Sequence, residues 1–366
     1  MVIDFIFSPA FGNRPSHLVG REPILRTFES ALRSRPGSKD RAIVVLGQRG
    51  SGKTVLLWEF ADRARQQGYV VASPTIASGG MLERVVEKVQ DDGEKYVRDK
   101  TGRVSGGSVG ALGFSAGLQF TRDVRESKTF EYKLASLARR LSERGRGIVI
   151  LIDELQANSA EIRQLVIAYQ ELVGEGLDVA LVMAGLPGAV SATLNDKVLT
   201  FLNRARKVEL PPLARGDVDA FFLQAFDGLG IAIAPDLRRE ASNAVQGSPY
   251  MLQLVGHYIC AYAQDSGKVG RKELDAAIEA ARADFRTDVC ETTLAALSDR
   301  DIDFLTAMAK DNGPSAISDV AARMGVSHDY AQKYRRRLID AGVIEAAGRG
   351  KIAFAVPYLR GYLKNG

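Results

Sequence analysis

AIVVLGQRGSGKT, residues 42–54, is the stretch that decides the fold of this 366-residue chain. Its apolar, mostly β-branched first half predicts a buried strand over 42–46, and a helical pattern begins at Lys53. The loop between them fits GxxxxGK[ST] and lies between a strand and a helix, the setting in which that motif binds phosphate. Glycines permit positive φ, so successive backbone N–H groups can point at one anion beside a helix N-terminus. The nucleotide-binding residues predicted here are Gly47, Gln48, Arg49, Gly50, Ser51, Gly52, Lys53, Thr54 and Val55.

Two side chains of this loop have chemical roles beyond shape. Lys53 is expected to reach the β- and γ-phosphates and to assist catalysis there, whereas the Thr54 hydroxyl is expected to bind Mg²⁺. The loop therefore predicts ATP or ADP with Mg²⁺ as cofactors.

A second acidic motif follows the apolar run GIVILID, residues 147–153. In an open α/β sheet ligands bind beyond the carboxyl ends of the strands, which is where this run delivers Asp153 and Glu154. We expect Asp153 to hold Mg²⁺ through water and Glu154 to act as the catalytic base that polarises the attacking water. An exposed acidic turn is the alternative for the pair alone, and the phosphate loop upstream favours the catalytic interpretation.

Further short apolar runs predict strands over 69–74, 179–185 and 207–210, each separated from the next by helical patterns. Alternating strands and helices indicate a parallel sheet covered on both faces, the three-layer α/β class. From about Gly216 to Asp288 the patterns are all helical, and a third unit begins near Ser298. The predicted domains are an ATPase domain over 1–214, a helical lid over 215–292 and a winged helix-turn-helix domain over 293–366.

The two motifs and this domain order resemble the AAA+ and STAND branch of the P-loop ATPases, within the ASCE group. Leu18-Val-Gly-Arg-Glu22 matches the hhGRE element of that branch, and Gly247-Ser-Pro249 matches the GxP element of its helical domain. The likeness is greatest to the archaeal-ATPase and origin-initiator-like groups. It implies ATP hydrolysis, and it implies that Val19, Gly20, Arg21 and Pro249 lie at the nucleotide.

The chain departs from that family pattern after the fourth strand. Ala184 and Gly185 stand where relatives often place a polar sensor of the γ-phosphate, and Asn195 and Gln156 are the alternative candidates for that role. Arg204 and Arg206 precede the fifth strand, where the family places an arginine finger, although surface charges fit them equally. A finger acting in trans would require self-association into an oligomer. We therefore expect slow hydrolysis, as in a switch.

The C-terminal unit resembles a winged helix-turn-helix. Gly325 is expected to end one helix and Ser327 to cap the next, the helix that would read DNA. At 100° per residue Ala331, Tyr334, Leu338 and Ala341 form its core stripe, so Arg336 points outward. Double-stranded DNA would then be bound by base contacts from Gln332 and Arg336 and phosphate contacts from the other basic residues. Those phosphate contacts are Lys333, Arg335, Arg337, Arg349 and Lys351.

The charge of this unit supports DNA only modestly. Residues 315–366 hold nine Lys and Arg against four Asp and Glu, and Asp329 and Asp340 on the outward face would repel phosphate. The alternative is that of STAND relatives, in which the winged helix folds back as an autoinhibitory latch and the partner is a regulatory protein. The leading hypothesis is an ATP-driven switch that positions a DNA-binding winged helix.

Composition excludes several other classes. No apolar run reaches 18 residues, so no membrane span is expected, and the first residues lack the basic start of a signal peptide. Cys260 and Cys290 have no CxxC partner, and the histidines lack metal-ligand spacing. These features predict a cytoplasmic protein without zinc. The glycine-rich segment 103–124 is either a surface hairpin inserted in the α/β domain or a loop that touches a partner or DNA.

Overall fold

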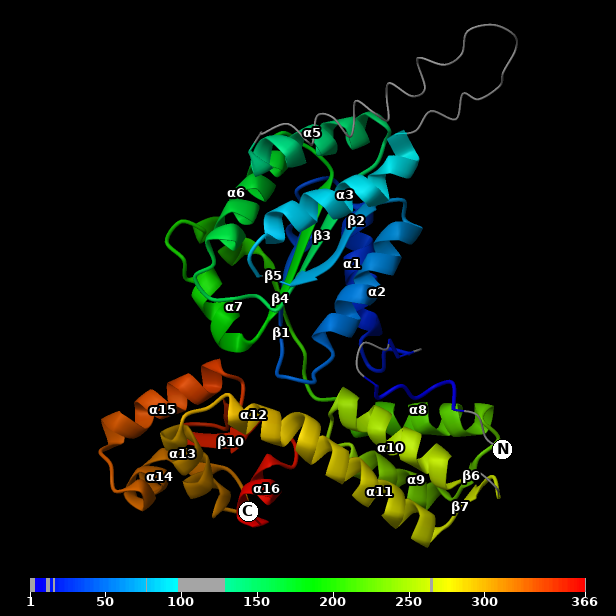
Figure 1. Cartoon of the computed structure of the whole chain (residues 1–366), viewed down its shortest axis with the longest axis vertical. Coiled ribbons are helices and arrows are strands. Elements are labelled where there is room, and N and C mark those ends of the chain that lie inside the picture. The colour runs from blue at the N-terminus through cyan, green and yellow to red at the C-terminus, as the bar shows by residue number, and fades with distance from the viewer. Residues whose placement is uncertain are drawn as a thin grey trace, which may run out of the picture.

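A five-stranded parallel sheet, in the order β2-β3-β4-β1-β5, forms the centre of the first part of the chain (Figure 1). The computed structural model describes residues 4–10, 14–15, 17–76, 78–97, 129–263 and 266–365. The glycine-rich segment 103–124 lies outside these residues. All five predicted strands are present, and their bounds differ from the predicted ones by at most two residues. They are β1 (Ala42–Leu46), β2 (Val70–Ile76), β3 (Ile148–Asp153), β4 (Val179–Gly185) and β5 (Arg206–Glu209).

Helices cover both faces of this sheet, which confirms the three-layer α/β class (Figure 1). Each apolar strand sends alternate side chains to opposite faces, because the side-chain period of a strand is two. In β1, for example, Val44 packs in one core cluster while Ile43 and Val45 pack in the other. One face carries α1 (Glu22–Arg33) and α2 (Lys53–Gln66). The other carries α3 (Met81–Val97), α5 (Phe130–Glu143), α6 (Ala160–Gly174) and α7 (Pro187–Leu194).

Helices then dominate from α8 to α12, as the sequence predicts. A two-residue parallel pairing of β6 with β7 is the exception, since these residues are too few to leave a strand pattern in the sequence. A π-helix over Arg286–Glu291 joins α11 to α12, so that the three segments form one continuous helix (Figure 1). The elements are α8 (Arg215–Gly228), β6 (Ala232–Ile233), α9 (Pro235–Ala244), α10 (Pro249–Tyr262), β7 (Lys268–Val269), α11 (Arg271–Phe285) and α12 (Thr292–Ala295).

The C-terminal unit, defined here as residues 298–365, contains the three helices and the hairpin that the sequence predicts. Gly325 ends α14 with φ +64°, and the Ser327 hydroxyl accepts a hydrogen bond from Tyr330 N at 3.2 Å. A short third strand, β8, and a last helix, α16, were not predicted. The elements are α13 (Asp299–Ala309), β8 (Ser315–Ala316), α14 (Ile317–Met324), α15 (His328–Asp340), β9 (Ile344–Ala346), β10 (Lys351–Phe354) and α16 (Leu359–Asn365).

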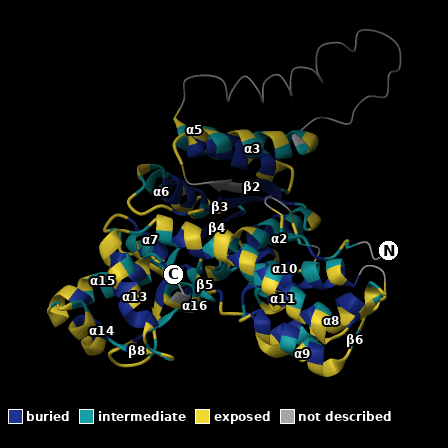
Figure 2. Cartoon of the chain, turned by 60° about the horizontal axis from the view of Figure 1, so that its bottom comes forward, coloured by how far each residue is buried: buried dark blue, intermediate teal, exposed yellow. Residues whose placement is uncertain are grey.

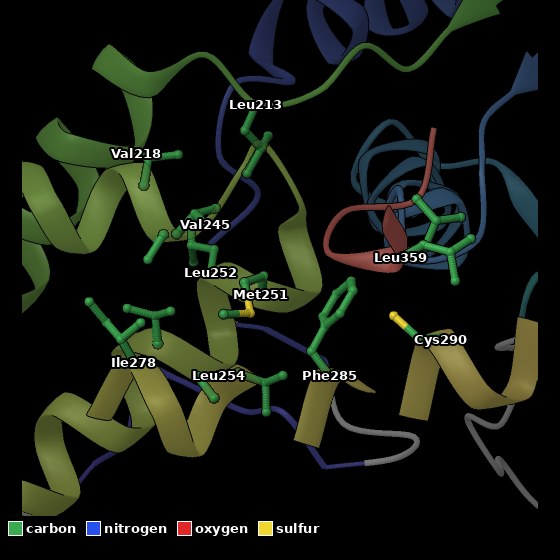
Figure 3. Close-up of a cluster of buried hydrophobic side chains, with 14 of the residues drawn as sticks. Leu213, Val218, Val245, Met251, Leu252, Leu254, Ile278, Phe285, Cys290 and Leu359 are labelled. Atoms are coloured by element: carbon green, nitrogen blue, oxygen red, sulfur yellow. The ribbon is translucent and has the colours of Figure 1, made fainter. Parts of the chain in front are cut away.

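One cluster of buried apolar side chains runs through both the lid helices and the C-terminal unit. It includes Phe7 near the N-terminus and runs from Leu213 before α8 to Leu359 at the start of α16. Figure 2 colours the buried residues of both parts dark blue, and Figure 3 shows part of the cluster as sticks. Phe285 at the end of α11 lies within it, with its ring 6.1 Å from that of Tyr250 and 5.9 Å from that of Tyr358. These two parts therefore pack as one body, and the predicted boundary between them at 292/293 stays a prediction.

None of the helices in the described ranges is long and apolar enough to cross a membrane.

Candidate functional site

The loop after β1 and the acidic end of β3 meet at one edge of the sheet. Thr54 Oγ1 donates a hydrogen bond of 2.6 Å to Asp153 Oδ2, so the two predicted Mg²⁺ ligands already lie together. A hydroxyl and a carboxylate in contact are the hard oxygen donors that Mg²⁺ requires. This donor set therefore fits the ion that the motif implies.

The backbone of the loop is shaped for an anion. Gly50 and Gly52 have φ of +72° and +87°, values that side chains disfavour. A Cβ on Gly47 would stand 2.3 Å from Ser51 Oγ and 3.2 Å from Ser51 Cβ, so a larger residue there would displace the Ser51 side chain. The side-chain oxygens of Gln48 and Ser51 are buried without a hydrogen-bond partner among the described residues. The Ser51 hydroxyl lies within the loop, at 2.3 Å from the Cβ position of Gly47, so a phosphate bound there would give it a hydrogen-bond partner.

Lys53 turns back onto its own loop. Its Nζ donates to the carbonyls of Gly47 at 2.8 Å and Gln48 at 2.7 Å. Burial lowers the pKa of Lys53 to about 8, although Asp153 nearby favours the charged form. An ammonium held only by two neutral carbonyls is available to a phosphate, which would satisfy its charge better.

Glu154 has an unusual backbone. Its φ is +52°, and its N–H donates to Asp153 Oδ1 at 2.9 Å. Non-glycine residues in this region are mildly strained and occur most often at functional sites. The side chain is exposed at the edge where the phosphate loop opens, which suits a base acting on a water.

The start of α10 touches the loop, and the connection between β5 and α8 packs against the turn that precedes α10. Pro249 Cγ lies 3.8 Å from the point that a Cβ on Gly52 would occupy, so the start of α10 touches the loop. Gly247 packs on the connection between β5 and α8, because Leu213 N donates to its carbonyl at 2.8 Å. The buried Arg21 also holds this connection, donating to the Pro211 carbonyl at 2.6 Å. Burial lowers the pKa of Arg21.

The C-terminal unit also reaches the loop, a contact that sequence analysis missed. We define the turn 340–342, at the end of α15, as the docking turn. A Cβ on Gly342 would stand 2.0 Å from Gln48 Oε1, and a Cβ on Gly188 would stand 2.5 Å from Asp340 Cβ. Figure 1 accordingly places α15 below α7 and the sheet edge. No local signal could reveal this contact, since its two sides are far apart in the sequence.

The predicted DNA-binding residues fall into three groups. Lys333, Arg336, Arg349 and Lys351 are exposed, and within the described ranges none of them forms an ion pair. Arg337 is engaged instead, because its Nε donates to Asp301 Oδ1 at 2.8 Å and its guanidinium covers the Tyr334 ring. Gln332 and Arg335 are half-buried, and Arg335 Nε has no hydrogen-bond partner in the described part of the chain.

The predicted arginine fingers lie away from the chain's own loop. Arg206 starts β5 at the edge opposite the phosphate loop and donates to Asp40 Oδ1 at 3.0 Å. Arg204 ends a short 3-10 helix just before it. Neither can act on the nucleotide of its own chain from this edge, so a role in trans stays a prediction.

Comparison with known proteins agrees with this geometry. Residues 17–182 match the family described as "AAA ATPase domain", and residues 287–363 match a "Domain of unknown function (DUF8462)". No match was found among curated proteins.

Several solved structures share the fold. The Walker-type ATPase of Pyrococcus abyssi is 17% identical, with a TM-score of 0.65 and 100% of both chains covered. The ORC2 protein of Aeropyrum pernix, in its ADPNP-ADP complexes, is 15% identical with a TM-score of 0.65, covering 98% of this chain and 95% of that one. CDC6P of Pyrobaculum aerophilum is 14% identical with a TM-score of 0.51, covering 98% and 96%.

Proposed function

Since the chain carries a P-loop ATPase domain of the AAA+ type, we propose that it is an ATP-binding switch with slow, Mg²⁺-dependent hydrolysis. In this proposal the C-terminal unit is a winged helix that acts as a latch on the nucleotide site. One observation carries the proposal: the docking turn is seated against the phosphate loop at Gln48 and against the start of α7 at Gly188.

The residues of the loop support nucleotide binding and hydrolysis. The backbone N–H groups and Lys53 would hold the phosphates, and Thr54 with Asp153 would hold Mg²⁺, which neutralises phosphate charge when bound. Glu154 would accept a proton from the attacking water. The ORC2 protein of Aeropyrum pernix, whose structure is that of its ADPNP-ADP complexes, supports these ligands by similarity of fold.

The latch follows from where the contact lies. A ligand shifts a conformational equilibrium only when it interacts differently with the two states. The docking turn touches the loop that binds phosphate, so a nucleotide would change the surface that the turn rests on. We therefore propose that ATP shifts the C-terminal unit from the docked to the undocked position.

The test uses a substitution that opens the contact without disturbing the fold. Gly188 is the second residue of α7, and Gly188→Ala would set a methyl group 2.7 Å from the Asp340 carbonyl oxygen. Gly216→Ala is the matched control, because Gly216 is the second residue of α8 and a Cβ there would meet nothing within 4 Å. Alanine favours helix over glycine at both positions.

The exposed residues Ser142 and Ser318 would each be changed to Cys and spin-labelled. The distance between the two labels would then be measured by double electron-electron resonance. Burial raises the pKa of Cys260 to about 12 and that of Cys290 to about 11, so these thiols should resist labelling. We expect Gly188→Ala to lengthen the distance without nucleotide, and ADPNP to lengthen it in the wild type. A wild-type distance that ADPNP leaves unchanged would refute the switch.

DNA binding is a second candidate output, favoured by Lys333, Arg336, Arg349 and Lys351, which are exposed and form no ion pair with any residue that the structure describes. Phosphate contacts release counterions, so log K for a duplex should fall with log salt at a slope of several units. Arg336→Glu should abolish this binding. If the protein binds no duplex at low salt with ATP, with ADP or without nucleotide, the regulated partner is not DNA, and a regulatory protein becomes the candidate.

A further inference from the structure

We infer that Gln48 is a positioning residue for the C-terminal unit's docking turn. Its conformation depends on whether phosphate is bound in the loop, and it determines whether the docking turn stays docked. This inference rests on the proposed function, because it names the residue through which the switch would be released. Gln48 is the variable second position of the GxxxxGK[ST] motif, and the motif does not assign its side chain a task.

The first step concerns Lys53. Its Nζ is bonded to the backbone carbonyl of Gln48 at 2.7 Å and to that of Gly47 at 2.8 Å. A triphosphate competes for the same ammonium group, and a charge-assisted bond to a phosphate is stronger than a bond to a neutral carbonyl. Binding of the β- and γ-phosphates therefore releases the Gln48 carbonyl, and the backbone at Gln48 is free to reorient.

The second step concerns the Gln48 side chain. A Cβ on Gly342 would stand 2.0 Å from Gln48 Oε1 and 3.2 Å from its Cδ, so the amide lies against the Gly342 backbone. Gln48 Oε1 is buried without a hydrogen-bond partner in the described part of the chain. A buried amide oxygen without a partner opposes the docked state, so a small change at Gln48 suffices to release the turn.

The third step concerns the far side of the docking turn. The Cβ position of Gly342 also lies 3.5 Å from Leu186 Cδ2, and Leu186 directly follows β4. This is the segment in which Ala184 and Gly185 replace a polar γ-phosphate sensor. The docking turn thus contacts both the loop and the residue that follows β4, which lets the C-terminal unit respond to nucleotide at the point where Ala184 and Gly185 offer no polar side chain.

A double-substitution cycle tests whether Gln48 and Gly342 act together. Gly342→Ala would displace the Gln48 amide, and Gln48→Ala would remove it. Gly325→Ala is the matched control, because Gly325 has φ +64° against +71° for Gly342, yet a Cβ there would meet nothing within 4 Å. The strain of alanine at positive φ is thereby equal in the two variants.

The measured quantity is the response, the ratio of the docked population without nucleotide to that with saturating ADPNP. It is read from the distance between the Ser142 and Ser318 labels, after the ADPNP affinity of each variant has been determined. We expect Gln48→Ala and Gly342→Ala each to reduce the response at least fivefold, and the double variant to reduce it no further. Gly325→Ala should keep the wild-type response and combine additively with Gln48→Ala.

The outcomes separate the two proposals. A wild type without a response refutes the switch itself. A wild type that responds, with Gln48→Ala responding equally, refutes only the role of Gln48. Additive effects of Gln48→Ala and Gly342→Ala would likewise show that the two residues act independently and overturn the inference.

Discussion

At the scale of single residues, Lys53 gives the site a pH dependence. Its pKa is lowered to about 8 in this structure, whereas a bound phosphate would keep the ammonium group charged. Below pH 8 the free protein already carries the charge. As the pH rises through 8 the free protein loses this proton, and nucleotide binding must take it up again. Affinity for ADP should therefore fall roughly eightfold between pH 7.5 and pH 9.

Isothermal titration calorimetry with ADP at several pH values measures this effect. Lys53→Arg is the control, because a guanidinium stays charged over this range and its affinity should not follow the same curve. Identical pH profiles for the two proteins would show that Lys53 does not titrate in the free site.

Glu154 should separate binding from turnover. Glu154→Gln keeps the size of the side chain and removes its basicity, so ATP binding should persist while hydrolysis falls by about 10²-fold or more. Phosphate release and binding of a fluorescent ATP analogue measure the two properties. Turnover equal to the wild type would remove Glu154 from the role of base.

At the scale of elements, the edge of the sheet opposite the loop is held by a buried cation. Arg41, only 1% exposed, ends a 3-10 helix before β1 and is paired with Asp178, which precedes β4. Its NH2 group also donates to the Leu32 carbonyl at 2.7 Å and to the Ser34 carbonyl at 2.6 Å. Tyr69 OH donates to the same carboxylate at 3.0 Å. One guanidinium thus joins α1, β1 and β4.

Arg41→Ala should lower the free energy of unfolding by about 3 kcal/mol, because it removes a buried guanidinium from the Leu32 and Ser34 carbonyls and leaves Asp178 with Tyr69 alone among the described side chains. Arg139→Ala is the control, since Arg139 pairs with Glu175 on the surface and such pairs contribute little. Urea unfolding followed by circular dichroism compares the two. Equal midpoints would contradict the structural role of Arg41.

At the scale of the whole molecule, the lid helices and the C-terminal unit should behave as one cooperative body. Phe285, 1% exposed, lies between Tyr250 of α10 and Tyr358 of the C-terminal unit. Figure 3 shows it in the cluster with Met251, Cys290 and Leu359. Tyr250 OH also donates to Asp288 Oδ2 in the π-helix at 2.6 Å. Movement at the loop side of α10 is thereby linked to the C-terminal unit.

Phe285→Ala should destabilise this body by about 3–5 kcal/mol through the cavity it creates. Hydrogen exchange should then accelerate in both α10 and α16, and not in the sheet. Phe60→Ala in α2 is the matched control and should instead accelerate exchange around β1. Faster exchange in α10 alone after Phe285→Ala would show that the two parts are independent.

Local sequence determined much of this protein. The phosphate loop, its acidic partner and the five strands were predictable because they follow from backbone freedom, side-chain period and the order of short elements. The helix end at Gly325 and the cap at Ser327 were equally local. The structure then placed Thr54 against Asp153, as the two motifs require.

Tertiary structure alone showed which residues the C-terminal unit contacts. The periodicity of α15 correctly separated the buried Ala331 and Leu338 from the exposed Arg336, but it could not show that Arg337 bonds Asp301. Nor could it show that Gly342 rests on Gln48, because contacts between distant residues depend on how whole elements pack. Composition and spacing predict which face of a helix is exposed, but they do not predict which other element packs against that face. The tertiary fold determines what packs there, and in this structure the end of α15 packs against the phosphate loop.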